Sequence, residues 1–526
     1  METEGATPQD RQEAREPKNI VVLCDGTGNE VLGDLSNVLK LFRIVRKDAR
    51  QRVYYDPGVG TVGEDDEWRR RMQKLKGVFG LATGAGLDDN VLEAYRFLAN
   101  VYEKGDRIYL FGFSRGAYTV RALAGFIHMI GLLRPDQVNI ADYALTAYKR
   151  SGHRHEKVQR AAVRNAIAGL LADRSPEPAG DRQGDGESPD HKGFEAAWAF
   201  GRATAARHVT IHFVGVWDTV ASMVVPNGLT FQLRTLPFTR RNPSVRAFRH
   251  AMAIDERRRM FRLNRWDEGQ PFVKNPFATP EPEILDQDCE QLWFCGVHSD
   301  VGGSYAEKES GLSKLPLIWM VEEAKKQGLR TNEAMFKHLA CGIPREGATH
   351  EYVPPDPCGP MHVSLKGFWK FLEIIPKSTW WREWSRGFLG YYLPLAEPRV
   401  VEPGAKLHWS VEKRLACPAT PSAGRPPGLI FPPYAPINLN PRRERQPRES
   451  RWASLGRLLL GIPMLALVGA PAALAIWCWW RPALTFLGSL GLATLVFASA
   501  ALLLLLVAAL IGLVGNVGGS PEGERS

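Results

Sequence analysis

The sequence has few cysteines, and none of them has the spacing of a structural metal or disulfide site. Seven cysteines are spread over 526 residues, and no C-x-x-C pair occurs. We therefore expect neither a disulfide scaffold nor a zinc site, and a reducing compartment fits this pattern best. No phosphate-binding G-x-x-x-x-G-K-[ST] motif is present near the glycine-rich N-terminal turn. These absences leave no metal and no cofactor to expect.

The first 18 residues are polar and lack the apolar segment of a signal peptide. We expect residues 1–18 to form a flexible tail. The net charge of +10 is basic, but zinc-finger and RNA-binding signatures are missing, so no nucleic-acid partner is expected. Part of the excess lies immediately before an apolar region, which favours a membrane as the partner. These cationic residues are Arg442, Arg443, Arg445, Arg448 and Arg451.

Short apolar runs alternate with segments of helical periodicity through residues 19–330. This alternation predicts an α/β fold, an α/β-hydrolase-type mostly parallel sheet with helices on both faces. Strand-like runs lie at Asn19–Cys24, Arg52–Asp56, Arg107–Phe111, His208–Trp217 and Gln291–Val297. Helical patterns lie at Asn90–Glu103, Tyr118–Leu133 and Leu315–Lys326. A polar stretch at 151–192 has the composition of a disordered insertion.

The remaining chain changes composition twice. Residues 331–439 are rich in proline and aromatics. We interpret them as a cap on the catalytic domain or an extension of it, the alternative being a surface that faces substrate or membrane. Residues 440–457 form a basic linker, and two uncharged stretches follow at Leu458–Trp480 and Ala483–Val514.

Each uncharged stretch is long enough to cross a bilayer as a helix. The sequence therefore predicts a two-helix transmembrane hairpin at 458–514, followed by a C-terminal tail at 515–526. Arginines are concentrated before the first span, and only Arg481 separates the two spans. The positive-inside rule then predicts a two-pass membrane protein with its catalytic domain in the cytoplasm, on a bacterial inner membrane.

The segment Gly112–Gly116 has the form G-x-S-x-G and joins a predicted strand to a predicted helix. A serine on such a turn is exposed to substrate only if the turn is sharp, and glycine at both flanking positions avoids steric clashes. This context predicts that Ser114 is a nucleophile, with Gly112 and Gly116 as structural residues of the elbow.

A serine nucleophile needs a general base and a group that orients it. Asp218 and His298 each follow a predicted strand, in the chain order acid then histidine. We predict that His298 is the base and that Asp218 orients it. Asp255 is the alternative acid and His250 the alternative base. Asp300 is interpreted as a capping residue, with a cation role as the less favoured alternative.

Acyl transfer also needs two backbone N–H donors for the developing oxyanion. Arg115, the residue after the predicted nucleophile, supplies one of them. The turn after the first strand, D-G-T-G-N from Asp25, is placed to supply the other through Gly26 or Thr27.

Four motifs occur in a fixed order: D-G-T-G-N, G-F-S-R-G-A, V-W-D-T-V and G-V-H-S-D-V-G-G. Together they resemble the α/β-hydrolase domain family that includes the phospholipase effectors of type VI secretion systems, the Tle1-like catalytic domain. The resemblance extends from about Asn19 to Glu323. It implies an esterase or phospholipase whose triad is Ser114, Asp218 and His298.

The function expected from sequence is that of a membrane-anchored serine hydrolase. It would cleave carboxylic esters, above all acyl esters of lipids or phospholipids, through an acyl-enzyme. The alternatives are a hydrolase of a soluble ester, thioester or amide, and a catalytically silent membrane scaffold. The expected partners are a lipid bilayer and a lipid substrate, and the oligomeric state is open.

Overall fold

The computed structural model describes most of the chain between residues 16 and 439. The described residues are 16–26, 35–58, 86–151, 195–220, 223–227, 230–234, 236–274, 283–374, 377–378, 391–419 and 426–439. The predicted insertion lies outside them except for Ser151, and so do the basic linker, the predicted hairpin and the C-terminal tail.

A six-stranded sheet forms the centre of the fold, and every neighbouring pair of its strands is parallel. The strand order is β10-β7-β4-β3-β1-β2. The strands are β1 (Asn19–Cys24), β2 (Gln51–Asp56), β3 (Arg107–Phe113), β4 (Ile211–Trp217), β7 (Val245–Ala253) and β10 (Asp288–Phe294). β1, β3 and β4 are buried along almost their whole length, as strands covered on both faces must be.

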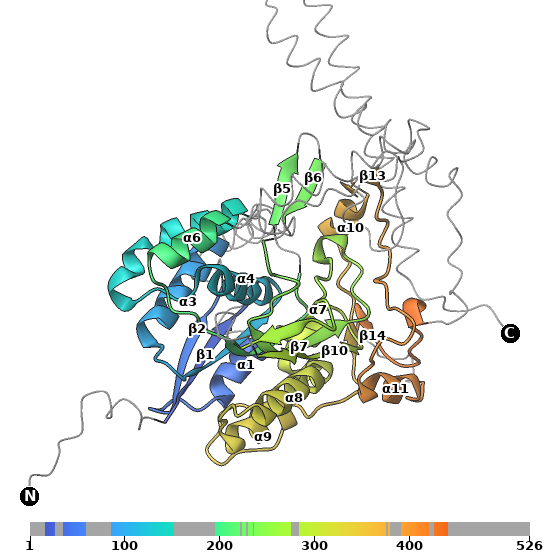
Figure 1. Cartoon of the computed structure of the whole chain (residues 1–526). Helices are drawn as coiled ribbons and strands as arrows, with labels where there is room; N and C mark the ends of the chain where they lie inside the picture. Colours follow the sequence, from blue (N-terminus) through green and yellow to red (C-terminus); the bar gives the residue numbers. More distant parts are fainter. Residues whose placement is uncertain are drawn as a thin grey trace, which may run out of the picture.

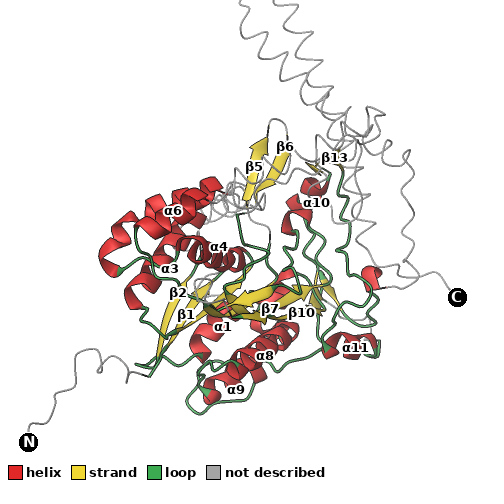
Figure 2. Cartoon of the chain, in the orientation of Figure 1, coloured by secondary structure: helices red, strands yellow, loops and turns green. Residues whose placement is uncertain are grey.

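Helices cover both faces of the sheet (Figures 1 and 2). One face packs against α3 (Leu87–Val101), α4 (Arg115–Ile130) and α6 (Glu195–Ala203). The other packs against α1 (Asn37–Ile44), α8 (Gly311–Lys326) and α9 (Glu333–Cys341). Successive β1 residues alternate between the two cores, Ile20 and Val22 on one side and Val21 and Leu23 on the other.

The strand order places a topological switch point between β1 and β3. From β1 the chain passes outward to β2, then returns to β3 on the other side and continues to β10. In open parallel sheets the crevice beyond the carboxyl ends of strands at such a point is the usual ligand site. The turns after β1 and β3 meet there.

Several smaller elements lie between these or follow them. They are η1 (Pro135–Ile140), β5 (Met223–Asn227), β6 (Thr230–Arg234), η3 (Arg259–Phe261), β8 (Pro271–Val273), β9 (Ile284–Asp286), α7 (His298–Gly302), η4 (Glu307–Glu309), β11 (Met361–His362), α10 (Phe368–Glu373), β12 (Lys377–Ser378), β13 (Tyr391–Tyr392), α11 (Trp409–Leu415), β14 (Leu429–Ile430) and η6 (Ile437–Leu439). The β5–β6 hairpin lies with α10 and β13 above the same part of the sheet in Figure 1, and β6 contacts β12.

Residues 331–439 share a hydrophobic core with the sheet. Met361, Val411 and Tyr434 belong to the same buried cluster as Val21 of β1. The backbone N–H of Trp293 on β10 donates to the Lys406 carbonyl, and the His408 N–H donates to the Trp293 carbonyl. This segment therefore packs directly on the edge of the central sheet.

One disulfide, between Cys358 and Cys417, lies in this C-terminal segment. No sequence signal marks this bond, because the two cysteines stand 59 residues apart and share no recognised spacing. The remaining cysteines of the described chain, Cys24, Cys289, Cys295 and Cys341, are free thiols.

The strands and helices predicted within residues 19–330 are present, with ends that differ by a few residues. Of the strands in the central sheet, β7 was missed. Its sequence, VRAFRHAMA, carries two arginines and a histidine, so it lacks the continuous apolar run that marked the other buried strands. The structure accommodates Arg249 through ion pairs with Glu323 and Asp288. No helix among residues 16–439 as described has the length and apolar character to cross a membrane.

Candidate active site

Ser114 occupies a strained turn between β3 and α4. Its φ of 58° and ψ of −118° lie in a region that side chains with a Cβ rarely adopt, at a cost of about 1–3 kcal/mol. Its backbone N–H donates to the carbonyl oxygen of Trp217 at 3.1 Å. This bond ties the turn to the end of β4, the strand that precedes Asp218.

The two flanking glycines are sterically required. A Cβ on Gly112 would lie 2.4 Å from the carbonyl oxygen of Gly116. A Cβ on Gly116 would lie 2.0 Å from the carbonyl oxygen of Cys24. The second contact brings the first turn of α4 against the carboxyl end of β1, beside Asp25.

Asp218 and His298 are brought together from separate strands. Asp218 follows β4 with a φ of 38°, and His298 begins α7 after β10. The distance between Asp218 Oδ2 and His298 Nδ1 is 2.5 Å, and the Ala253 N–H donates to Asp218 Oδ1 at 2.9 Å. Both side chains are buried, with Asp218 0% and His298 3% exposed.

The other ring nitrogen of His298, Nε2, is buried and has no hydrogen-bond partner within the described part of the chain. Phe113 lies beside the ring with a centroid separation of 4.6 Å, and Phe261 contacts it edge-on at 4.8 Å. Phe113 is the residue immediately before Ser114, so the imidazole lies next to the strained turn. A buried polar atom without a partner needs an explanation, and a base that waits for its proton donor is one.

Burial lowers the pKa of His298 below its ordinary value, although the hydrogen bond and charge of Asp218 act in the opposite direction. The imidazole is therefore neutral near pH 7 and able to accept a proton. Arg258 also disfavours the charged ring, whereas Glu256 favours it. The Glu256 carboxylate accepts the backbone N–H of His298 at 3.2 Å.

Arg399 is a site residue that the sequence analysis missed. Its guanidinium makes two bonds to the Asp218 carboxylate, 2.6 Å to Oδ1 and 3.0 Å to Oδ2. Burial alone would raise the pKa of Asp218, but Arg399 and His298 hold it well below its ordinary value. No local motif marks Arg399, because it lies 181 residues from its partner.

The alternative residues lie in other hydrogen-bond networks. His250 Nε2 accepts the N–H of Thr219 at 3.2 Å, and burial lowers the pKa of His250 to about 3. Asp255 accepts bonds from the Gly296 N–H and the Tyr434 hydroxyl. Burial raises the pKa of Asp255 to about 6. Asp218 and His298 are thus the acid and the imidazole that the structure places in contact.

Asp300 caps the short helix α7 and bonds His362. Its Oδ2 accepts the N–H of Val297 at 3.0 Å, and its Oδ1 lies 2.7 Å from His362 Nδ1. The described residues contain no group of three or more His, Cys, Asp or Glu side chains arranged to hold a metal ion.

The predicted oxyanion residues are placed as follows. Arg115 is the first residue of α4, where the helix terminus favours negative charge. Gly26 follows β1, and its N–H donates to Asp25 Oδ1 at 2.7 Å. Thr27 lies outside the described residues.

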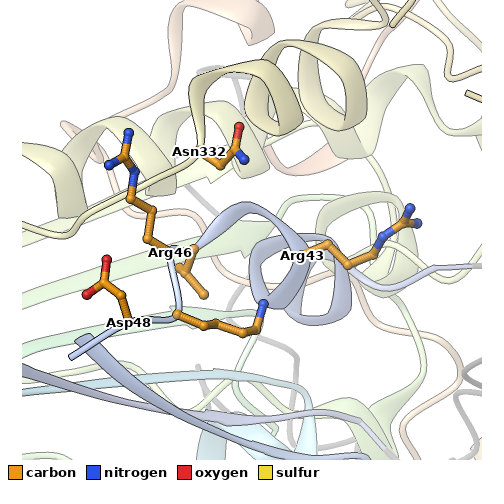
Figure 3. Close-up of a pocket in the computed structure, with 6 residues that line it drawn as sticks. Arg43, Arg46, Asp48 and Asn332 are labelled. Atoms are coloured by element: carbon orange, nitrogen blue, oxygen red, sulfur yellow. The ribbon is translucent and has the colours of Figure 1, made fainter. Parts of the chain in front are cut away.

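A separate open pocket lies at the far end of α1 (Figure 3). It is lined by Arg43, Val45, Arg46, Lys47, Asp48 and Asn332. The N-terminal end of α1 follows Ser36, whose hydroxyl donates to the Asp25 carboxylate at the carboxyl end of β1. The pocket of Figure 3 is therefore remote from Ser114.

Comparison with known proteins identifies the family. The model of the family described as "T6SS, Phospholipase effector Tle1-like, catalytic domain" matches residues 18–323. This match spans more than half of the chain, and the chain belongs to that family. The match ends before Arg399.

The uncharacterized protein YEL023C of Saccharomyces cerevisiae is 32% identical over 470 residues. The alignment covers 66% of this chain and 64% of that relative, so the chain spans less than two thirds of the relative's length.

Two solved structures show only a distant likeness. An uncharacterized protein from Pseudomonas aeruginosa is 18% identical with a TM-score of 0.32, over 62% of this chain and 48% of that one. The Tle1 effector bound to the VgrG spike of the type VI secretion system is 17% identical with a TM-score of 0.24, over 56% and 52%.

The elbow glycines provide a direct test of the turn geometry. We expect Gly116→Ala to lower the free energy of unfolding by about 3 kcal/mol or more, because its methyl group would overlap backbone atoms that cannot move aside. Gly359→Ala is the matched control, since its Cβ would approach no atom closer than 3.2 Å. Urea unfolding of both variants measures the difference, and equal stabilities would contradict the described contact.

Removal of the Asp218 carboxylate should destabilise the protein more than removal of a carboxyl whose bonds go to neutral groups. We expect Asp218→Asn to lower the free energy of unfolding at pH 7 by about 3–5 kcal/mol, because it leaves a buried guanidinium without its counter-charge. Asp255→Asn removes a half-buried carboxyl that pairs with a hydroxyl and an N–H, and it should cost less. A larger loss in Asp255→Asn than in Asp218→Asn would refute this account.

Proposed function

We propose that this protein is a serine hydrolase that cleaves acyl esters of phospholipids. The observation that supports this most is the His298 imidazole. It is buried, bonded through Nδ1 to Asp218, unpartnered at Nε2, and in contact with the residue before the strained Ser114. A general base between an orienting carboxylate and a hydroxyl nucleophile has these features.

In the proposed acylation step, His298 Nε2 takes the proton of Ser114 Oγ as that oxygen attacks the ester carbonyl carbon. The C–O bond to the leaving alcohol then breaks, and the imidazolium returns the proton to the departing alkoxide oxygen. Water, deprotonated by the same imidazole, then attacks the acyl carbon. The bond to Ser114 Oγ breaks, the imidazolium returns the proton to Oγ, and the free fatty acid leaves. Asp218 keeps the ring oriented and stabilises its charged form in both steps.

The oxyanion formed at the carbonyl would be stabilised by backbone donors at the carboxyl edge of β1 and β3. Arg115 N–H is the first donor in this proposal, because it follows the nucleophile. Gly26 or Thr27 supplies the second. A role for Gly26 requires its N–H to leave Asp25 Oδ1, and the contact of Gly116 with Cys24 keeps that turn close.

A phospholipid substrate is supported by two independent features. The family to which the chain belongs is described as a phospholipase effector domain. The two uncharged stretches within residues 458–514 are each long enough to cross a bilayer. We infer that they form a hairpin that holds the catalytic domain against the membrane.

The side of the membrane is proposed from two opposing features. The arginines of residues 440–457 favour a cytoplasmic catalytic domain on a bacterial inner membrane. The Cys358–Cys417 disulfide favours an oxidising compartment. We propose the cytoplasmic placement. Labelling of free thiols in intact cells by an impermeant maleimide tests it, and labelling of the catalytic domain would contradict it.

Replacement of the nucleophile tests the proposed reaction. We expect Ser114→Ala to abolish labelling by a fluorophosphonate probe and to reduce release of fatty acid from mixed phospholipid vesicles by about 10⁴-fold or more. Ser151→Ala is the control, because the bond that its hydroxyl makes within the described chain goes to the carbonyl of Ala147. Folded protein that resists the probe would contradict a serine mechanism, and labelling without fatty acid release would redirect the proposal to a soluble ester, thioester or amide.

Removal of the C-terminal region tests the anchor. We expect the full chain to remain in membranes after carbonate extraction and a chain ending at Asn440 to be released. The reason is that the uncharged stretches supply the apolar surface that holds the protein in lipid. Retention of the shortened chain would show that another surface binds the membrane.

A further inference from the structure

We propose that Arg399 is a positioning residue of the active site, which locks the Asp218 carboxylate and sets the pH range over which His298 can act as a base. This inference rests on the proposed function of Ser114, His298 and Asp218. It assigns a role to a residue that lies outside the segment matched by the family model, residues 18–323.

The geometry of Arg399 is that of a buried clamp. The side chain is 3% exposed, and its two terminal nitrogens each bond one oxygen of Asp218. The same nitrogens also donate to the carbonyl oxygens of Ala253 at 2.8 Å and Phe261 at 2.7 Å. A planar guanidinium that makes paired bonds fixes the rotation of a carboxylate, which a single ammonium cannot do.

The surrounding chain holds Arg399 in this position. Asn438 Nδ2 donates to the backbone carbonyl of Arg399 and also to that of Ile254, both at 3.1 Å. The Arg257 side chain bonds the carbonyl of Ala396 at 3.0 Å. Residues after the family domain are thereby fastened to the loop that follows β7, and Arg399 projects from them onto the acid.

The paired bond between Arg399 and Asp218 has an electrostatic consequence for His298. The Asp218 carboxylate faces two cationic partners, Arg399 and the His298 ring when it is protonated. Because Arg399 neutralises much of the carboxylate charge, Asp218 stabilises the imidazolium less than an unpaired carboxylate would. The proton on His298 is therefore lost at a lower pH, and the base is available over a wider range.

The other charges around His298 act in both directions, and one of them, the Glu256 carboxylate, itself interacts with Arg399. Arg258 disfavours the imidazolium and Glu256 favours it, and these two side chains bond each other. Phe113 and Phe261 flank the ring without adding charge. Removal of Arg399 should therefore shift the titration of His298 upward.

The test is the pH dependence of fluorophosphonate labelling of the full chain. In the unaltered protein we expect the acid limb to have its midpoint below about 6.5, the ordinary imidazole value. In Arg399→Met and Arg399→Gln we expect the midpoint to rise by about one pH unit or more, with a slower maximal rate. In Arg399→Lys, which keeps the charge but not the paired geometry, we expect the midpoint to stay near that of the unaltered protein while the maximal rate falls.

Arg414→Met is the matched control. Arg414 is also fully buried and comes from the same C-terminal segment, but its bonds go to the carbonyl oxygens of Pro357, Gly359 and Ile430. Its removal tests loss of a buried arginine without a change at Asp218. We expect it to leave the midpoint unchanged, even if it lowers stability.

The outcomes separate the two proposals. An unaltered chain that is never labelled at Ser114 would refute the proposed function. A labelled chain whose midpoint is the same in Arg399→Met or Arg399→Gln, or shifts equally in Arg414→Met, would refute the role of Arg399 alone. If the Arg399 variants do not fold, the acid limb of the unaltered protein still tests the electrostatic effect. A midpoint at or above about 7, beyond the ordinary imidazole value, contradicts that effect.

Discussion

The Asp218 carboxylate is the charge on which the candidate site depends. It is fully buried, so it is stable only where other groups replace its hydration. Three parts of the chain do this: the loop after β10 through His298, the end of β7 through the Ala253 N–H, and the C-terminal segment through Arg399. These three parts of the chain are held together because each of them bonds the same carboxylate.

Because Arg399 bonds Asp218, the segment beyond the family domain is part of the candidate site. Residues 331–439 pack against the sheet and supply Arg399 to Asp218, His362 to Asp300 and Ser364 to Glu256. They thus contribute to the surroundings of the site. The family match, which ends at residue 323, includes Ser114, Asp218 and His298 but not Arg399.

The sequence was sufficient to predict the parallel sheet, the turn at Ser114 and the pairing of Asp218 with His298. Each of these has a local signal, such as an apolar run, a glycine pair or a polar residue at a strand end. The sequence was insufficient for β7, whose arginines conceal its burial, and for Arg399, whose partner lies far away in the chain. Contacts of this kind depend on tertiary packing and leave no periodic pattern.

The central claim is that His298 serves Ser114 as a base. A crystal structure of the full chain after reaction with a fluorophosphonate tests it most directly. The account predicts phosphorus bonded to Ser114 Oγ, with His298 Nε2 within about 3.2 Å of an oxygen on that phosphorus or of Oγ, and Asp218 still bonded to Nδ1. An adduct on another residue, or a His298 ring turned away from the adduct, would contradict it.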